Sequence, residues 1–479
     1  MRNLKDAWLG VTAIVIVFAA GFAVVTNPFY AIVGVLGIAV AVLLATKPDW
    51  FIPITLVLAC VAVPAGTPTT VGFSGFTFPI YEMTLFVAFV LAVRRGVGRY
   101  TKRRVTFFAL WMLCGLSVSF LDGLVPVRII GDIRTPIQLV MALVVAAVYI
   151  ETDTARKCAE ALKWTLWFSA ILTILASVSG LKLAGRSGDS TLIGNSDAVR
   201  FLTATNFPAL GTVCVCAALI VLGRASLRST AMWTIPALII LLMAFSRNHI
   251  IGLALAVLVA LVATRDLRTI MRAVIRVAVA AAVLVLVTWG VTSSVFDDFP
   301  GHSWAKLQAD SYASRVLEGL TEESRERDSS ALYREEETQR LTLSISEAPV
   351  MGHGFGYAYK PAEGQRGSWF YDQGPYYAHN FYLWALVKSG VVGLFLFLAA
   401  LARPLIRPVL RPTNPVATSF AAAAIGLLGV SWVAPMPLGS PSAVVLGALV
   451  GVVCGLHIPT RAVSEEDTGI RPESAAARV

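Results

Sequence analysis

The chain alternates between apolar stretches, many close to the length of a membrane-spanning helix, and short polar connections. A helix needs about 20 residues to cross the hydrocarbon of a bilayer. About fourteen stretches meet or approach that length. They lie near residues 8–25, 30–45, 51–64, 78–93, 105–120, 137–150, 164–181, 207–222, 232–245, 250–263, 277–295, 380–402, 416–434 and 442–457. The pattern predicts an all-α fold, a polytopic transmembrane bundle of about 12 to 14 spans.

Composition and charge exclude the soluble classes of protein. Of the 479 residues, 57% are hydrophobic and only 14% are charged, whereas a soluble domain carries about 25% charged residues. The net charge of +10 would suit nucleic acid, but the basic residues flank apolar runs and form no single patch. We therefore expect a membrane protein with no nucleic-acid partner. All six cysteines fall within or beside apolar segments, so we expect no disulfide framework.

The basic connections predict an orientation. Short loops rich in Lys and Arg stay in the cytoplasm, and the basic clusters at 94–104, 224–228, 265–276 and 403–411 fall on one side when every span is counted. Both termini are then cytoplasmic, and the long polar segment before residue 379 is extracytoplasmic. The predicted organisation is residues 1–295 with eleven spans, 296–378 as a large outer loop, 379–457 as C-terminal spans, and 458–479 as a disordered cytoplasmic tail.

The outer loop carries polar and aromatic features that lipid does not require. Its stretch 329–347 places Leu332, Leu341 and Ile345 among charges, which predicts an amphipathic helix lying on the membrane or capping the bundle. Glycines at 352, 354 and 356 permit turns with positive φ and close approach of a ligand. Aromatic residues at 369–377 fit either an interfacial belt or a surface on which sugars stack.

Four ionisable side chains at the outer face are candidates for chemistry. The imidazole of His379 can take a proton from a hydroxyl, although an interfacial His is often structural. Arg247 lies between two apolar spans with almost no loop, so it needs an anionic partner or a wet cleft, unless it snorkels to the headgroups. Arg200 and Arg334 are the other two. Guanidinium groups suit phosphate, and several in one outer cleft would hold a pyrophosphate.

Acidic residues give little support for a metal site. Asp297 and Asp298 sit beside Pro300 and Gly301 and fit a helix end. Asp122 and Asp132 are expected on the first outer loop, and no ligand spacing joins His353 to His379. We expect neither a metal nor another cofactor.

Four local features together resemble the O-antigen ligase and polymerase superfamily of bacterial polysaccharide assembly. They are Ser246-Arg247 at the outer end of a span; Arg334 fifteen positions before Pro349, followed by Gly352, Gly354 and Gly356; His379-Asn380-Phe381-Tyr382-Leu383, with Gly390 and Gly393 after it; and Arg200 shortly before Asn206. The sequence departs from the family pattern at Asn248, Thr338 and Lys388, the last of which stands where the family often has an acidic residue.

The resemblance implies a GT-C-like membrane glycosyltransferase of the bacterial inner membrane. Its donor would be a glycan on a polyprenyl (undecaprenyl) pyrophosphate, and its partners would be a glycan, lipid or cell-wall acceptor and membrane lipids. It would work at the outer face, without metal and with inversion. Arg247 and Arg334 would bind the leaving pyrophosphate, and His379 would orient or deprotonate the acceptor hydroxyl. The implied substrate-binding residues are Arg200, Asn380, Tyr382, His353 and Gly354.

Two alternatives to an enzyme stay open at this point. A transporter or a flippase for lipid-linked glycans would also have many spans, but it needs ionisable groups in them, and Glu82 and Lys388 are the few candidates. A scaffold for envelope assembly would tolerate the loss of His379. Within the enzyme interpretation, polymerase and ligase both fit the sequence.

Overall fold

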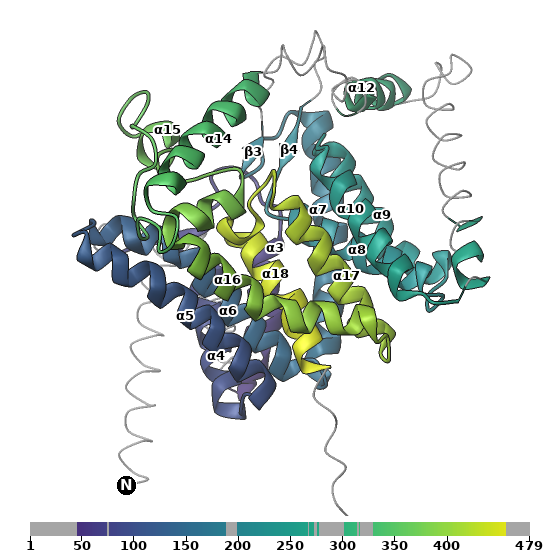
Figure 1. Cartoon of the computed structure of the whole chain (residues 1–479). Coiled ribbons are helices and arrows are strands. Elements are labelled where there is room, and N and C mark those ends of the chain that lie inside the picture. Colours follow the sequence, from purple (N-terminus) through teal and green to yellow (C-terminus); the bar gives the residue numbers. More distant parts are fainter. Residues whose placement is uncertain are drawn as a thin grey trace, which may run out of the picture.

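A computed structural model describes residues 46–73, 76–187, 199–266, 268–272, 275–276, 301–313, 316 and 329–456. Within these residues the protein is a mostly helical bundle (Figure 1). Four described helices are long and apolar enough to cross a membrane, namely α5 (Arg99–Leu121), α6 (Pro126–Tyr149), α7 (Asp153–Ser179) and α16 (Phe381–Leu410). The predicted spans at 8–25, 30–45 and 277–295, Asp297 and Asp298, and the tail 458–479 lie outside the described residues.

Shorter helices complete the described bundle, and their bounds follow the predicted apolar stretches. They are α3 (Phe51–Cys60), α4 (Ile80–Arg95), α8 (Asn206–Val221), α9 (Leu227–Met243), α10 (Asn248–Ala263), α17 (Pro415–Val430) and α18 (Ser440–Gly455). In contrast, α5, α6 and α7 begin 6 to 11 residues earlier than hydropathy predicts, because their first turns carry charged residues. Asp132 is therefore not on an outer loop, as we predicted, but inside α6, where only 8% of it is exposed.

The centre of the bundle is the contact between α6 and α18. Gly447, Gly451 and Gly455 lie one turn apart on α18, and a Cβ added at Gly447 would lie 2.2 Å from the carbonyl oxygen of Leu139. A Cβ at Gly451 would lie 2.3 Å from that of Leu143. Small residues at this spacing let two helix backbones approach closely, which is how helices associate in lipid.

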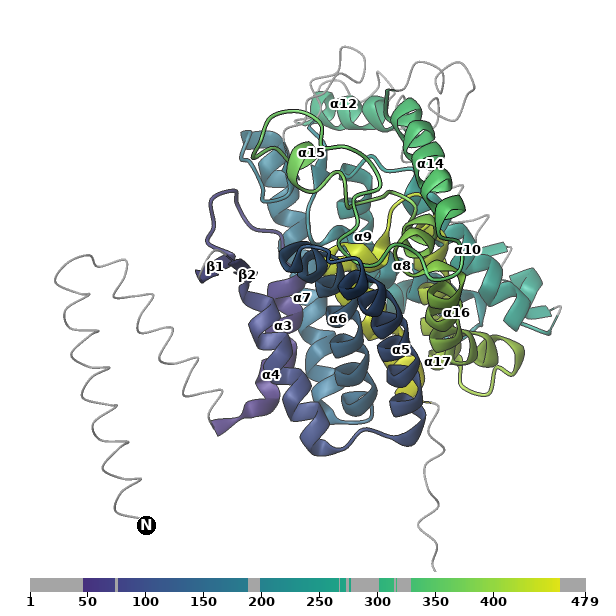
Figure 2. The same cartoon turned by 60° about the vertical axis from the view of Figure 1, so that its left-hand side comes forward.

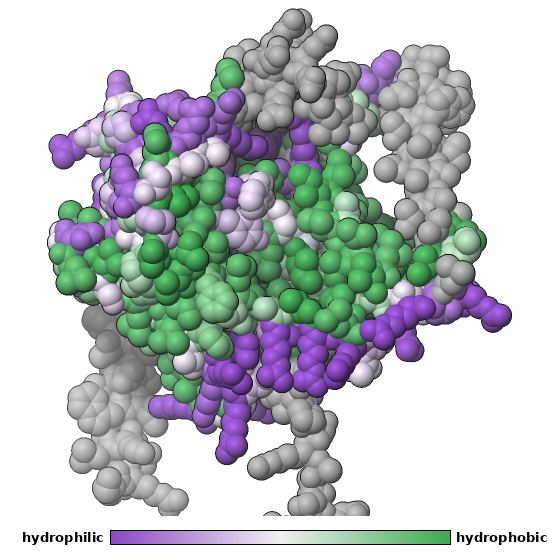
Figure 3. Space-filling view, in the orientation of Figure 1, coloured by the Kyte–Doolittle hydropathy of each residue, from purple (hydrophilic) through white to green (hydrophobic). Residues whose placement is uncertain are grey.

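The two ends of the bundle differ in composition. Figure 3 shows a hydrophobic band between hydrophilic rims. At one end, contacts join the basic connections: Arg265 donates to the carbonyl of Leu410, Arg276 donates to that of Ile220, and Arg403 lies 5.9 Å from the ring centroid of Tyr100. The structure thus gathers the four predicted basic clusters on one side, while the assignment of that side to the cytoplasm stays a prediction.

Among the described residues, the opposite end carries three helices of the predicted outer loop, α12 (His302–Tyr312), α14 (Ser329–Glu347) and α15 (Trp369–Asp372) (Figures 1 and 2). In the described residues, two small antiparallel pairs of strands add strand to the all-α fold that we predicted. One pairs β1 (Thr70–Phe73) with β2 (Phe76–Pro79), and the other pairs β3 (Arg186–Ser187) with β4 (Phe201–Leu202). They lie in connections, where a local hairpin satisfies backbone groups that no helix supplies.

Helix α14 has the predicted bounds but a different buried face. Leu341 is fully buried, as predicted, whereas Leu332 is 56% exposed. The other buried positions are Glu337 and Ser344, so the inward stripe of α14 combines one apolar and two polar side chains. This face packs on α16, and α14 caps the bundle.

The segment 349–356, called the glycine loop below, packs against α16 at a point where that helix is interrupted. Gly390 has φ 61°, which interrupts the helix. The loop supplies the missing partners: Val391 N–H donates to the carbonyl of Pro349 at 2.9 Å, and Gly354 N–H donates to that of Lys388 at 3.0 Å. Gly352, Gly354 and Gly356 all have positive φ, as predicted. Their close approach is to helices, since a Cβ added at Gly354 would lie 2.6 Å from the backbone nitrogen of Ser119.

We predict that Gly354→Ala destabilises the protein. An L side chain at this φ costs about 1–2 kcal/mol, and the contact with α5 adds a further 1–3 kcal/mol or so. Thermal unfolding in detergent measures the loss. Gly367→Ala is the matched control, because Gly367 also has positive φ (90°) but an added Cβ there meets nothing within 4 Å. Equal destabilisation of the two variants would contradict the close packing of the loop on α5.

Candidate functional site

A buried carboxylate holds His379 at the end of the bundle that carries α14. The imidazole Nδ1 of His379 lies 3.2 Å from both carboxylate oxygens of Glu337, and the backbone N–H of His379 donates to Glu337 Oε2 at 2.9 Å. The Glu337 side chain is 3% exposed, whereas that of His379 is 25% exposed. The imidazole is therefore fixed on its buried side and accessible on the other.

The two residues meet because of where their helices lie. Glu337 is on the inward stripe of α14, four positions before the buried Leu341. His379 immediately precedes Asn380, the N-cap of α16, whose Oδ1 accepts from the N–H groups of Tyr382 and Leu383. An N-cap fixes the entry of the chain into a helix, and thus it places His379 at the helix mouth.

The carboxyl of Glu337 is ionised in this setting. Burial by itself raises its pKa, but hydrogen bonds and charge from His379 and a hydrogen bond from Tyr359 outweigh burial and hold the pKa below 4.5, its ordinary value. The hydroxyl of Tyr359 donates to Glu337 Oε1 at 3.1 Å, and burial raises the pKa of Tyr359, so this donor keeps its proton. An ionised carboxylate only accepts hydrogen bonds. Nδ1 of His379 must therefore carry a hydrogen, which leaves Nε2 of a neutral ring able to accept a proton.

Aromatic rings enclose the imidazole. Tyr333 and Tyr377 meet it edge to face, with ring centroids 5.9 and 5.4 Å away. Lys360 donates to the Tyr333 hydroxyl at 2.5 Å and lies 4.4 Å from its ring centroid. Trp369 in turn meets Tyr377 at 5.3 Å. Part of the predicted aromatic cluster thus forms the wall around His379.

Arg334 lies one helical turn before Glu337 on α14, so the two side chains leave the same region of the helix. Arg334 is half-buried, and its Nε is buried without a hydrogen-bond partner among the described residues. Buried polar atoms are almost always hydrogen-bonded in native structures, so an exception calls for an explanation. A ligand oxygen would supply the missing partner.

Arg200 and Arg247 form a second cationic group. Arg247 is the N-cap residue of α10, directly after the α9–α10 turn, where Phe245 has φ 41°. Arg200 Nε donates to the carbonyl of Ala244 in that turn at 2.9 Å. Both guanidinium groups therefore belong to the N-terminal end of α10, where the helix dipole is positive. In the part of the chain that the structure describes, the four candidate residues fall into two groups, one around Glu337 and one at α10.

The other candidate binding residues have contacts within the protein. Asn380 is occupied as a helix cap, and the hydroxyl of Tyr382 donates to the carbonyl of Leu428 at 2.7 Å. The ring of His353 stacks on Tyr357 at 4.1 Å, and its Nε2 lies 2.8 Å from the carbonyl oxygen of Ser344. Gly354 packs on α5. These four residues fix the glycine loop, α14 and the start of α16.

A buried ion pair between α6 and α16 holds the glycine loop next to the site. Lys388 Nζ lies 2.6 Å from Asp132 Oδ2 and also donates to the carbonyl of Tyr357 at 2.6 Å, while Gly356 N–H donates to the same Asp132 oxygen at 2.7 Å. The lysine that departs from the family pattern thus has an acidic partner on α6. Glu82, the acidic residue that the sequence placed within a span, is paired with Arg134 at 2.7 Å.

Sequence reasoning missed Glu337 and the Asp132–Lys388 pair. Glu337 is the third of three consecutive glutamates, and its signal was its spacing: four before Leu341, it falls on the apolar stripe of α14. All six cysteines are free, as predicted. Over the described residues no group of three His, Cys, Asp or Glu side chains could hold a metal ion, and metal independence stays a prediction.

The comparison with known families bears on this same region. A family model described as O-antigen ligase matches residues 232–398, which include Arg247, Arg334, Glu337 and His379. The match runs from α9 into α16 and confirms the resemblance found from the local motifs. No curated protein matches the sequence significantly.

We predict that Glu337→Gln lowers the free energy of unfolding by about 1–3 kcal/mol at neutral pH, because it replaces charge-assisted hydrogen bonds. Since the folded pKa of Glu337 is lowered, its stabilisation is present above pH 4.5 and is lost as the pH falls through the lowered value. The difference in Tm between wild type and variant should therefore shrink on acidification. Glu335→Gln, at an exposed position of α14, is the control and should change Tm little at any pH.

Proposed function

We propose that this chain is a member of the O-antigen ligase superfamily, whose family model matches residues 232–398, and that it transfers a glycan from a polyprenyl pyrophosphate to an acceptor hydroxyl at the outer face of the inner membrane. The family itself supports a membrane glycosyltransferase of the ligase or polymerase type. We further propose a polyprenyl pyrophosphate as the carrier, inversion at the anomeric carbon, and a role for each of the residues below.

The chemical step assigns one role to each part of the site. Nε2 of His379 accepts the proton of the acceptor hydroxyl as that oxygen attacks the anomeric carbon. The bond from this carbon to the pyrophosphate breaks, and the configuration inverts because attack is in line. The pyrophosphate leaves with the bonding electrons, and guanidinium groups stabilise the charge that develops on it.

The observation that carries the proposal is the contact between Glu337 and His379. A base must be held in one tautomer with its accepting nitrogen exposed, and a buried carboxylate on the other ring nitrogen is a known way to do so. Nδ1 lies 3.2 Å from both oxygens of Glu337, and the imidazole is the exposed partner. A histidine that served only the membrane interface would not need a buried anion.

The arginines supply the site for the diphosphate. Arg334, with its unpartnered buried Nε, is one turn from Glu337. Arg247 and Arg200 add two guanidinium groups at the N-terminus of α10, and a helix N-terminus itself favours anions. We propose that the headgroup of the carrier bridges Arg334 and the pair Arg247 and Arg200. The substrate-binding residues that the resemblance implies would position His379 and the arginines around that headgroup; they are Asn380, Tyr382, His353 and Gly354.

The proposed organisation follows the predicted boundaries. Residues 1–295 and 379–457 form the membrane body, 296–378 form the extracytoplasmic catalytic loop, and 458–479 are a cytoplasmic tail. The enzyme uses no metal. A transporter or flippase is the alternative, but the described ionisable pairs within the spans, Asp132–Lys388 and Glu82–Arg134, are closed by direct contacts.

We predict that the reconstituted full chain, supplied with a lipid-diphosphate glycan and a glycan acceptor, releases free polyprenyl pyrophosphate. His379→Ala and Arg334→Ala should each lower kcat/KM on the order of 100- to 1000-fold. Glu337→Gln should cost on the order of 100-fold, because the amide donates to Nδ1 and favours the wrong tautomer. Product gels then separate the two activities, since ladders indicate a polymerase and a single transfer indicates a ligase.

Arg340→Ala is the matched control for Arg334→Ala. Arg340 is also on α14, but it pairs with Glu336 at the surface, 2.6 Å away, and its loss should leave kcat/KM within about threefold. Carrier bound without turnover, or movement of the intact lipid across the bilayer, would contradict the proposal and favour the flippase.

A further inference from the structure

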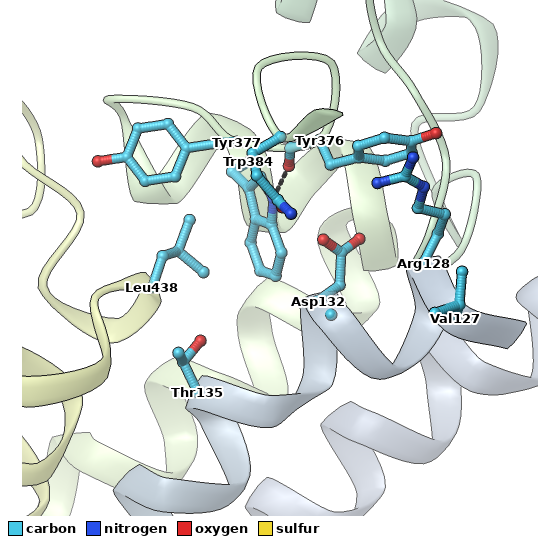
Figure 4. Close-up of a pocket in the computed structure, with 10 residues that line it drawn as sticks. Val127, Arg128, Asp132, Thr135, Tyr376, Tyr377, Trp384 and Leu438 are labelled. Atoms are coloured by element: carbon cyan, nitrogen blue, oxygen red, sulfur yellow. Dashed lines mark hydrogen bonds between the residues drawn. The ribbon is translucent and has the colours of Figure 1, made fainter. Parts of the chain in front are cut away.

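A cavity of about 200 Å³ lies beside His379 and has no role in the chemistry above. Its walls come from the outer part of α6, the segment 373–377, the first turn of α16 and Leu438 (Figure 4). Tyr377 belongs both to this cavity and to the enclosure of the imidazole, with ring centroids 5.4 Å apart. The cavity is therefore separated from the proposed base by one aromatic ring.

The lining combines aromatic faces with a few polar groups. Tyr376, Tyr377 and Trp384 supply rings, and the indole N–H of Trp384 is already used by the carbonyl of Tyr376 at 2.8 Å. Thr135 and Gln373 supply a hydroxyl and an amide. Rings that take an apolar C–H face, together with donors and acceptors that take hydroxyls, suit a sugar ring.

The charge of the lining argues against a phosphate. Arg128 is the lining cation, and its Nη1 already donates to the carbonyl of Asp372 at 2.6 Å while its guanidinium lies 4.7 Å from the ring centroid of Tyr376. The carboxylate of Asp132 also lines the cavity, but Lys388 neutralises it, and so this pair offers no net charge to a ligand. The ligand that fits is neutral and polyhydroxylated.

The volume limits the ligand to one ring. Pockets for drug-sized molecules have about 300–1000 Å³, and this cavity is smaller. Access is from the outer side, because Gln373 is exposed at its edge. Gly131 lines it too, and a Cβ added there meets nothing within 4 Å, so a side chain at this position enters open space.

We propose that this cavity is a subsite for a single sugar ring of the glycan substrate, held between Tyr377, Trp384 and α6 next to His379. Its function as a subsite of transfer rests on the proposed function. Binding of a sugar in the cavity does not rest on the proposed function, and so sugar binding and glycan transfer can be tested separately.

The test is saturation-transfer NMR on the full chain in detergent, with methyl glycosides of common hexoses, deoxyhexoses and N-acetylhexosamines as probes. At least one glycoside should receive saturation from the wild type. Gly131→Leu fills the cavity and should abolish that signal, whereas Gly131→Ala leaves most of the space and should keep it. Gln373→Ala should weaken the signal about threefold or more, and its matched control Gln365→Ala, at an exposed loop position, should not.

Two results would overturn the proposal. One is that no glycoside receives saturation from the wild type. The other is that Gly131→Leu, shown to be folded by gel filtration and circular dichroism, gives the same signal as the wild type. If Gly131→Leu does not fold, the comparison of Gln373→Ala with Gln365→Ala decides, and equal signals from these two would overturn the proposal as well.

The transfer assay then identifies the source of the ring. A subsite for the acceptor predicts that Gly131→Leu raises the KM for the acceptor at least about tenfold, while the KM for the lipid-linked donor stays constant. A subsite for the donor glycan predicts the reverse. Sugar binding without any turnover by the wild type would refute the proposed function but leave the subsite intact, and turnover with unchanged KM values in Gly131→Leu would refute the subsite alone.

Discussion

The described end of the bundle that carries α14 depends on an ionised carboxylate buried where α14 meets the start of α16. Burying a charge is costly unless hydrogen bonds and a counter-charge compensate it. Glu337 receives a backbone N–H, an imidazole and a tyrosine hydroxyl. These partners come from segments far apart in the sequence, and so the carboxylate specifies how the capping helix, the segment before α16 and the ring of His379 fit together.

The same site is supported from within the bundle by a buried charge pair. Asp132 on α6 and Lys388 on α16 satisfy each other, and Asp132 also accepts from the glycine loop at Gly356. The break at Gly390 lets that loop replace hydrogen bonds that α16 would otherwise make within itself. Loop, capping helix and histidine are therefore attached to helices long and apolar enough to cross a membrane, and rigid elements hold the geometry of a site better than free loops do.

The sequence predicted features that depend on residues close together in the chain, and it missed contacts between residues far apart in the chain. Hydropathy alone located the described spans, and the amphipathic pattern predicted the bounds of α14, because both are properties of one segment. The Glu337–His379 contact joins residues 42 positions apart, and Asp132–Lys388 joins residues 256 apart. No local pattern pairs such residues. His379 and Arg334 were nevertheless singled out as candidates, since motifs that resemble a family pattern include them, whereas Glu337 lies in a run of charged residues typical of a solvent-exposed helix face.

Glu337, as an ionised acceptor, requires His379 to carry its hydrogen on Nδ1 and leaves Nε2 free. The most direct measurement is ¹⁵N NMR of the full chain labelled at histidine, with the His379 signals assigned by their loss in His379→Gln. We expect, at a pH where the ring is neutral, a protonated Nδ1 and an unprotonated Nε2, and a shift of that balance in Glu337→Gln. A His379 ring that carries its hydrogen on Nε2, or that is unchanged by Glu337→Gln, would contradict the account.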